Sequence, residues 1–362
     1  MATELGSRLD RGITLPFDWF CDPEIFRLEQ RRVFADSWVY AGVADWAAEP
    51  GQFFTTRAGL VPIVVVRAED GRLNAFVNIC RHRATEVAKG RGRRMSLQCP
   101  YHAWTYGLDG CLRSAPRSEL EPEFDMADFG LVPVAVDTWG PFIFVNRNAD
   151  ASPLAGYLGR LPQILAEAGV DFGRMRFREH VESEIAANWK AVVENYLECY
   201  HCPTAHPGFS RVIDVGPETY ALTSEEWFSS QVSRTRAGAE RENGGLPYNP
   251  VGPVAEAHFH WLWPTFTINV FPGPPNLSTF YFIPISPDRT IAASDSFYGD
   301  EVSEEEIAAL DEFGGQVFDE DQALVESIQR AAASGGLSEG RLMLSSEHLI
   351  QHFQRLVERA LA

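Results

Sequence analysis

Two short motifs of cysteine and histidine constrain this chain most, because their four side chains must meet in space although sixteen residues separate the motifs. The first is Cys80-x-His82 and the second is Cys99-x-x-His102. Each offers one thiolate and one imidazole, which suits a [2Fe–2S] cluster in which one iron takes both cysteines and the other both histidines. A zinc site usually pairs cysteine with cysteine and histidine with histidine, so the mixed pairing favours the cluster. Imidazole ligation raises the potential to about −150 to +300 mV, which suits electron transfer and not substrate chemistry.

A second polar group lies between Glu194 and His206, inside a mostly apolar region. Glu194, Glu198 and His201 stand at i, i+4 and i+7, so on a helix they form one polar stripe. Two nearby prolines predict that the helix loosens after His201 and lets His206 fold back. Two histidines then face one metal ion. The alternative is an ordinary amphipathic helix with a solvated polar face.

A metal site of this kind also needs an anionic ligand. Oxygen activation at ferrous iron commonly uses two histidines and one carboxylate, with open positions left on the metal. Asp319, Glu320 and Asp321 are predicted to open a helix in which Leu324 and Ile328 are buried. Compensation of the helix dipole accounts for Asp319 and Glu320, which leaves one acid facing the core.

Composition limits the partners. The 362 residues carry a net charge of −19, which argues against nucleic acid and against an anionic membrane surface. No apolar run reaches the roughly eighteen residues of a membrane helix, and no targeting segment is evident at the N-terminus. We therefore expect a cytoplasmic protein. Cys199 and Cys202 are expected to be two buried thiols.

Hydrophobic periodicity divides the chain into three parts. Residues 1–37 form an N-terminal segment with a helix over 22–37, which begins at an Asp-Pro-Glu signal. Residues 38–150 alternate with period two and predict a small β-domain in which both cysteine-histidine motifs fall on loops where strands end. Its expected strands cover residues 53–56, 62–67, 73–78, 132–136 and 142–146.

Residues 151–362 mix helices with an antiparallel meander. A helix is expected over 154–168 and another begins near 188. A capping signal at Ser303 starts an acidic helix, and the last helix covers 346–361. Residues 220–253 give no readable pattern and suit a functional lid. The meander strands are expected at 265–271, 277–285 and 290–297.

These motifs, with Glu-Asn-x-x-Glu-x-Tyr-His-x₄-His and the late Glu-Asp, resemble the catalytic subunit of a Rieske non-heme iron oxygenase over nearly the whole chain. The resemblance implies an α+β fold in which an all-β Rieske domain precedes a helix-grip catalytic domain that also packs the N-terminal helix. It implies that His201, His206 and Asp321 bind Fe²⁺. It further implies that Asn195 lies near this iron and that Glu198 bridges toward a Rieske histidine.

The resemblance also implies partners. Such subunits use O₂ and NAD(P)H electrons delivered by a separate flavin or ferredoxin-type reductase, and this chain has no glycine-rich nucleotide-binding turn of its own. They are typically head-to-tail homotrimers in which one chain's cluster serves the next chain's iron. A Rieske electron carrier is the non-enzyme alternative, although it has no need for a second metal site.

For the substrate, the segment from Glu198 to Pro203 and the opening from Leu15 to Trp38 resemble the branch that acts on quaternary ammonium compounds such as glycine betaine, stachydrine, choline or carnitine. The implied reaction hydroxylates an N-methyl carbon and releases formaldehyde. Ring faces attract such cations by about 0.5–2 kcal/mol each. The aromatic residues expected to supply them are Trp261, Trp263, Phe266, Phe280 and Tyr281.

The competing substrate is an aromatic acid, hydroxylated by a mono- or dioxygenase that often has a separate small subunit. Its carboxylate needs a lysine or arginine partner. The candidates in the unreadable region and beside it are Arg211, Arg234, Arg236 and Arg241.

Overall fold

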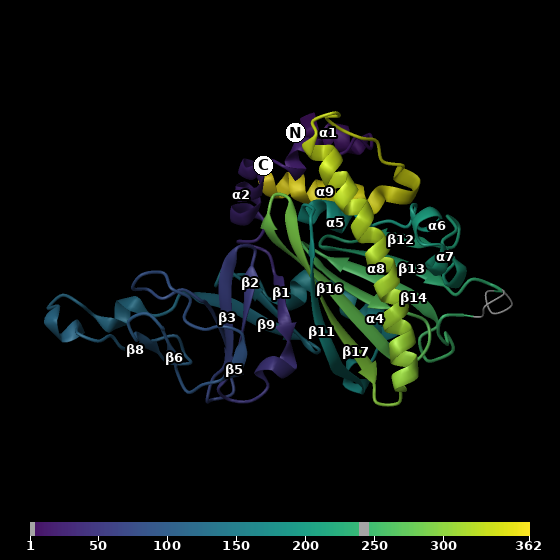
Figure 1. Cartoon of the computed structure of the whole chain (residues 1–362). Helices are drawn as coiled ribbons and strands as arrows, with labels where there is room; N and C mark the ends of the chain where they lie inside the picture. The colour runs from purple at the N-terminus through teal and green to yellow at the C-terminus, as the bar shows by residue number, and fades with distance from the viewer. Residues whose placement is uncertain (1–3, 239–245) are drawn as a thin grey trace. The chain divides into compact units, whose positions relative to one another are not determined.

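The computed structural model describes residues 4–238 and 246–362, which form two compact units (Figure 1). One unit covers residues 34–157, and the other joins the described residues before 34 to those after 157. Helices and antiparallel sheets occur together, so the predicted α+β class is confirmed. In these residues, no helix combines the length and the apolar character that crossing a membrane requires.

The smaller unit is built on an antiparallel sheet with the strand order β1-β10-β9-β4-β3-β2-β5. Its centre is apolar because β3 is fully buried from Ile63 to Val66. A shorter sheet, β6-β7-β8, is formed by the part of the chain between β5 and β9. The predicted strands are confirmed here. The strands of this unit are β1 (Val39–Val43), β2 (Gln52–Ala58), β3 (Val61–Arg67), β4 (Leu73–Val77), β5 (Arg91–Arg93), β6 (Leu97–Gln98), β7 (Thr105–Tyr106), β8 (Leu112–Ser114), β9 (Pro133–Trp139) and β10 (Phe142–Asn146).

The larger unit contains a second antiparallel sheet with the order β11-β17-β16-β15-β14-β13-β12. The three strands of the predicted meander are confirmed as β15, β16 and β17. The sequence missed β11, β12, β13 and β14. Most residues of β11 are polar, and a register shift between Phe177 and Glu179 interrupts its alternation. The strands are β11 (Met175–Ile185), β12 (Ala221–Ser224), β13 (Phe228–Arg234), β14 (Glu256–Leu262), β15 (Phe266–Val270), β16 (Asn276–Ser286) and β17 (Arg289–Gly299).

Helices cover this sheet. The long helix α8 runs across one face, and α9 lies beside α1 and α2 at one end of it (Figure 1). The capping box predicted at Ser303 is confirmed, since its hydroxyl accepts from the Glu306 N–H and the Glu306 carboxylate accepts from the Ser303 N–H. The helices are α1 (Glu4–Asp10), α2 (Pro23–Arg32), α3 (Leu154–Leu158), α4 (Leu161–Glu167), α5 (Trp189–Tyr196), α6 (Cys202–Ala205), α7 (Pro207–Val212), α8 (Glu304–Ala333) and α9 (Leu344–Leu361), with short 3₁₀ turns at Phe17–Phe20, Ala44–Ala47, Ser118–Leu120, Met126–Phe129 and Phe172–Arg174.

Several predicted helix boundaries are wrong. The helix expected over 22–37 ends at Arg32, although Asp22 caps it as predicted. The helix expected over 154–168 is two helices, because Gly159 adopts a left-handed φ of 54° and Pro162 starts the first turn of α4. The helix that carries the late acids begins at Glu304, so these acids lie in its middle and not at its start.

A buried ion pair fastens α2 to the rest of the larger unit. Lys190 and Glu29 have fully buried side chains, and the Lys190 Nζ atom donates to the Glu29 Oε1 atom at 2.5 Å. The Trp189 indole N–H donates to the other carboxylate oxygen at 2.8 Å. Both charges are therefore paired, and the start of α5 is held against the N-terminal helix.

We expect Lys190→Met to destabilise the protein by about 3–5 kcal/mol, because it leaves the Glu29 carboxylate buried without a counter-charge. The matched control is the double variant Glu29→Gln with Lys190→Met, which removes both charges and keeps an acceptor for Trp189. It should recover most of the loss. Chemical denaturation measures both values, and a loss below about 1 kcal/mol in the single variant would contradict a buried, uncompensated charge.

Candidate metal centres

The segment after α5 does not continue as a helix. The helix ends at Tyr196, so the predicted polar stripe of Glu194, Glu198 and His201 on one helix is wrong. Glu194 instead accepts from the Gln354 amide of α9 at 2.9 Å, and burial raises the pKa of this carboxyl to about 7. His201 precedes the short helix α6, and His206 lies between α6 and α7.

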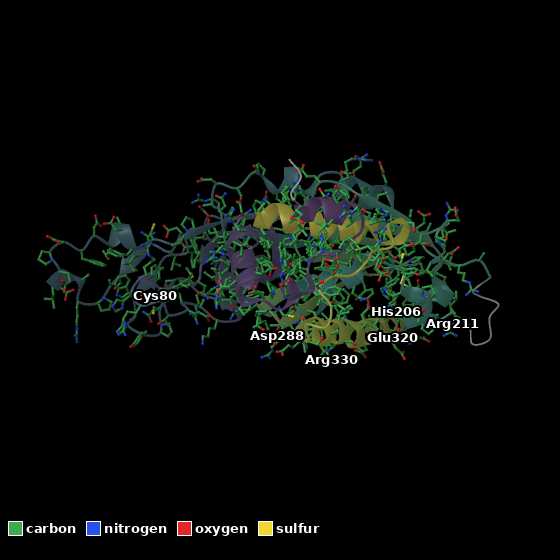
Figure 2. All side chains as sticks on the ribbon, turned by 90° about the horizontal axis from the view of Figure 1, so that it is seen from above. Cys80, His206, Arg211, Asp288, Glu320 and Arg330 are labelled. Carbon is green, nitrogen blue, oxygen red and sulfur yellow. A yellow bond between two sulfur atoms is a disulfide. The ribbon has the colours of Figure 1, made fainter. Side chains whose placement is uncertain are left out.

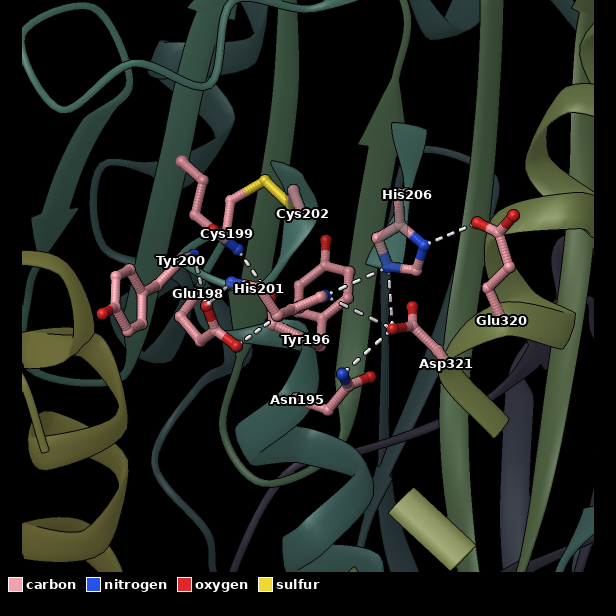
Figure 3. A network of polar contacts seen from close by, with 11 residues as sticks. Asn195, Tyr196, Glu198, Cys199, Tyr200, His201, Cys202, His206, Glu320 and Asp321 are labelled. Carbon is pink, nitrogen blue, oxygen red and sulfur yellow. Dashed lines mark hydrogen bonds and ion pairs between the residues drawn. A yellow bond between two sulfur atoms is a disulfide. The ribbon is translucent and has the colours of Figure 1, made fainter. Parts of the chain in front are cut away.

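Cys199 and Cys202 form a disulfide and are not the two thiols expected (Figure 3). The disulfide closes a loop of four residues that contains His201. Both cysteines are buried, with exposed fractions of 6% and 4%. The backbone on both sides of His201 is thus tied together covalently.

His201, His206 and Asp321 converge on one point although they come from separate segments (Figure 3). The two Nε2 atoms lie 3.0 Å apart, and the Asp321 Oδ1 atom lies 2.9 Å from Nε2 of His206 and 3.4 Å from Nε2 of His201. His206 folds back toward His201 as predicted, but the predicted cause is wrong. The helix already ends at Tyr196, and Pro203 lies in the first turn of α6 and does not loosen a helix. Two nitrogens and one carboxylate oxygen therefore surround a single position.

The outer nitrogens test whether this position suits a cation. The Nδ1 atom of His201 is hydrogen-bonded to Glu198, and the Nδ1 atom of His206 lies 2.7 Å from Glu320 Oε2 (Figure 3). When each Nδ1–H donates to its carboxylate, both Nε2 atoms present lone pairs toward the Asp321 oxygen. Three acceptors this close repel one another unless a proton or a metal cation lies between them. Carboxylates behind metal-bound histidines are the usual arrangement, so the residues fit an iron ion.

Without a metal ion, a proton takes the place of the cation. Burial alone lowers the pKa of His201, but its bonds to Asp321 and Glu198 outweigh burial and raise the pKa to about 9, so metal binding must release this proton. Burial alone raises the pKa of Asp321, yet hydrogen bonds from His201, His206 and Asn195 hold it below its usual value. The carboxylate is therefore ionised and available as a ligand.

Asn195 and Glu320 support this arrangement. The Asn195 amide donates to Asp321 Oδ1 at 3.0 Å, so it lies next to the site as predicted. The prediction that Glu320 compensates a helix dipole is wrong, because Glu320 lies in the middle of α8 and contacts His206. Leu324 and Ile328 are also not buried, with exposed fractions of 39% and 46%. The buried side of α8 is therefore displaced by one residue along the sequence from the side that was predicted.

A cavity of about 400 Å³ lies beside the three converging side chains. Aromatic rings line it, and two of them, Phe280 and Phe318, stack at 5.7 Å between ring centroids. Gly314 and Gly315 of α8 widen the cavity, because a Cβ added at either would meet no atom within 4 Å. Among the described residues that line it, five are acidic and none is lysine or arginine. The acids are Glu179, Glu198, Asp311, Asp319 and Asp321.

Of the five aromatic residues predicted to bind substrate, Phe280 alone is among the described residues at this cavity. Successive residues of a strand face opposite sides, so Tyr281 faces away from the cavity, and Phe266 pairs with Tyr281 across the strands. Trp261 and Trp263 lie farther along the sheet, where both pack against Phe353 of α9. The predicted cage is therefore not formed by these four side chains.

Three of the four arginines considered for an aromatic acid lie in the described part of the chain, and none of these three lines the cavity. Arg211 is an exposed residue of α7 (Figure 2), and Arg234 pairs with Glu256 on the surface. Arg236 is likewise not one of the lining residues. Arg241 falls outside the described residues.

The cysteine-histidine motifs lie in two similar turns of the smaller unit. Cys80 and Cys99 are buried, and the rings of His82 and His102 lie 4.6 Å apart. In each turn the residue four positions after the cysteine has a left-handed φ, 57° at Ala84 and 59° at Ala103, and donates its N–H back to the cysteine carbonyl at 3.1 Å. The structure thus places the two histidine rings side by side and both cysteines in one buried cluster.

Comparison with known proteins identifies the two domains. A model of the Rieske [2Fe-2S] domain matches residues 37–125, and a model of the ring hydroxylating alpha subunit (catalytic domain) matches residues 172–362. The chain belongs to the Rieske non-heme iron oxygenases. The oxygenase is 32% identical to the carnitine monooxygenase oxygenase subunit of Acinetobacter pittii, over 96% of this chain and 95% of that protein.

Two further relatives extend the comparison. The oxygenase is 33% identical to the chloroplastic choline monooxygenase of Arabidopsis thaliana, over 98% of this chain and 84% of that protein. Its structure matches that of a quaternary ammonium Rieske monooxygenase connected with carnitine oxidation, with a TM-score of 0.87 and 29% identity over 98% and 97% of the two chains. The roles of individual residues in both centres stay predictions.

We expect Tyr106→Phe to lower the reduction potential of the Rieske cluster. The Tyr106 hydroxyl accepts from the Arg81 N–H at 3.1 Å, which directs its own proton toward Cys80 Sγ at 3.3 Å. A donor to a ligand sulfur stabilises the more negative, reduced cluster. A redox titration followed by visible absorbance measures the shift. Tyr101→Phe, in the exposed part of the second motif, is the matched control, and equal potentials in both variants would contradict the contact.

Proposed function

We propose that this oxygenase hydroxylates a methyl carbon on the nitrogen of a quaternary ammonium compound, so that the product collapses to formaldehyde and a demethylated amine. One O₂ and two electrons from NAD(P)H are used for each turnover, and the second oxygen atom leaves as water. The observation that carries the proposal is the convergence of His201, His206 and Asp321 beside a cavity that combines aromatic rings with acids. The names of the relatives, which include carnitine and choline monooxygenases, support the substrate class.

In this proposal His201, His206 and Asp321 hold the mononuclear iron, and Cys80, His82, Cys99 and His102 hold the cluster. Bound ferrous iron supplies the O₂-activating chemistry. Glu198 and Glu320 keep each Nδ1 protonated, which leaves Nε2 free to bind metal, and Asn195 orients the Asp321 carboxylate. Glu198 also stays our candidate for the bridge toward a Rieske histidine.

The side chains around the cavity would place the substrate methyl group. Phe318 lies one helical turn before Asp321 on α8, and Phe280 faces it from β16. A trimethylammonium group against these rings gains about 0.5–2 kcal/mol from each face it meets. The acids at the cavity favour the approach of a cation in the same way.

Electrons reach the site from outside the chain in this proposal. A separate reductase, of flavin or ferredoxin type, would reduce the cluster. A homotrimer in which the cluster of one subunit serves the iron of the next would complete the path. Sedimentation of the purified oxygenase and reduction by the partner reductase test these two points directly.

We expect Asp321→Ala and His201→Ala to lower the iron content from about three to about two per chain, because the mononuclear site loses a ligand while the cluster keeps all four. The visible Rieske spectrum should stay unchanged. Asp319→Ala, two residues away on the same helix, is the matched control and should keep about three irons. Loss of the Rieske spectrum in Asp321→Ala would show that Asp321 is wrongly assigned to the mononuclear iron site.

We expect quaternary ammonium compounds to stimulate reductase-dependent O₂ uptake with equimolar formaldehyde release, and benzoate to stimulate neither. An oxygen electrode and a formaldehyde assay measure both. Uptake with an aromatic acid and none with any quaternary amine would overturn the substrate class while leaving the iron assignment intact.

Two variants connect this result to the cavity. Phe318→Leu removes a ring face and should weaken substrate binding by about 0.5–2 kcal/mol. Trp261→Phe changes an aromatic residue that packs against α9, away from the cavity, and should leave KM unchanged. If Trp261→Phe weakened substrate binding and Phe318→Leu did not, the aromatic cage predicted on the strands would be correct after all.

A further inference from the structure

The sheet of the larger unit presents a row of polar side chains to the cavity. Ser296 of β17 pairs with Ser278 of β16, and Ser278 pairs in turn with Asn269 of β15, so the three residues lie side by side. All three line the cavity. Their strand neighbours Thr279 and Asp295 are fully buried on the opposite face. The wall that the sheet gives to the cavity is therefore polar along this row.

The hydroxyls of Ser278 and Ser296 are open to the cavity and have no partner in the protein. Neither forms a side-chain hydrogen bond with another described residue, and neither is one of the buried polar atoms that lack a partner. Both residues are only partly buried. Asn269 differs, because its side-chain oxygen accepts from the Tyr196 hydroxyl at 2.8 Å. The two serines thus leave their hydrogen bonds to a molecule in the cavity.

The spacing of the two serines suits an oxygen-bearing group. Residues directly opposite each other on antiparallel strands have Cβ atoms about 4.5–5.5 Å apart. One oxygen atom between Ser278 and Ser296 accepts from both hydroxyls, and the two oxygens of a carboxylate each accept from one. A methyl group in this position would exclude water and leave both hydroxyls without a partner.

The aromatic pair lies one row away on the same face. Phe280 follows Ser278 by two residues on β16, which places it about 7 Å further along the strand. Its ring stacks on that of Phe318, against which the proposed function places the ammonium group. An extended chain advances about 3.5 Å for every three bonds. An oxygen five bonds from the nitrogen therefore reaches from the rings to the serines, and an oxygen three bonds away falls short.

We propose that Ser278 and Ser296 are specificity-determining residues, whose hydroxyls bind an oxygen about five bonds from the quaternary nitrogen of the substrate. This inference rests on the proposed function and names the substrate class within it. The carboxylate oxygens of carnitine lie five bonds from its nitrogen, and the hydroxyl oxygen of choline lies three bonds away. Overall identity does not separate these two cases, because the relatives named for carnitine and choline are 32% and 33% identical to this chain.

Two matched pairs of ligands test the proposal by calorimetric titration of the iron-loaded oxygenase. 4-Hydroxybutyltrimethylammonium has an oxygen five bonds from its nitrogen, where pentyltrimethylammonium has a methyl group. Choline and propyltrimethylammonium make the same comparison at three bonds. Ser278→Ala should lower the affinity ratio of the longer pair about fivefold, because one hydrogen bond to the oxygen is lost. It should leave the ratio of the shorter pair unchanged, because choline does not reach the serines.

Ser296→Ala should reproduce this result. Ser183→Ala is the matched control, since Ser183 lines the same cavity from β11 but pairs with Ala292, outside the row. It should leave both ratios unchanged. The visible Rieske spectrum and circular dichroism establish that each variant is folded, and if one serine variant does not fold, the other tests the same pair.

γ-Butyrobetaine adds a carboxylate at the position of the longer alcohol. Its affinity relative to pentyltrimethylammonium should also fall in Ser278→Ala if the serines receive a carboxylate. An effect on the alcohol alone would support the proposal for a neutral oxygen, and an effect on γ-butyrobetaine alone would support it for a carboxylate.

The outcomes separate this inference from the proposed function. Binding of the long ligands with ratios that neither serine variant changes would overturn the role of Ser278 and Ser296 and leave quaternary ammonium oxidation standing. Failure of all five compounds to bind and to stimulate O₂ uptake would overturn the proposed function itself.

Discussion

The larger unit depends on two imidazole nitrogens and one carboxylate oxygen that converge on one position and need a proton or a metal cation between them. His201 and His206 come from a loop and a helix junction after α5, and Asp321 comes from the middle of α8, 115 residues after His206. Holding these groups within 3.4 Å of one another opposes their mutual repulsion. The surrounding structure must therefore be rigid, and the buried pair of Glu29 and Lys190 anchors the start of α5 while the capping box anchors the start of α8.

Two further carboxylates orient the histidines so that a metal ion can bind between them. Glu198 and Glu320 accept from the outer nitrogens of the two histidines, so each imidazole is held at both ends and its tautomer is set. Asn195 instead donates to Asp321 Oδ1, the oxygen that faces the two histidines. Charge-assisted bonds of this kind are stronger than neutral ones. Because the ligands are pre-positioned, metal binding stabilises the folded unit without a large rearrangement.

The alternation of the strands decides what the substrate can meet. Phe280 faces the cavity and its neighbour Tyr281 faces the other side of the same sheet, because successive side chains of a strand point in opposite directions. Distance along a strand matters equally. Phe259 and Trp261 share a face of β14, yet Phe259 lines the cavity and Trp261 packs against Phe353 of α9. The cavity is aromatic and acidic because the alternation of side chains and the position of each residue along its strand together decide which side chains line it.

The sequence by itself determined the chemistry of the two centres, since the mixed cysteine-histidine spacing and the pair of histidines with a later acid select ligand types that no packing can change. It also determined the strands of the meander and the cap at Ser303, because period-two patterns and capping signals are local. Only the tertiary structure decided that α5 stops at Tyr196, that Glu320 supports His206, and that four of the five expected aromatic residues avoid the cavity. A local pattern sets the period of an element, but which of its faces meets a cavity depends on segments far away in the chain, here α8 and α9 packing on opposite parts of one sheet.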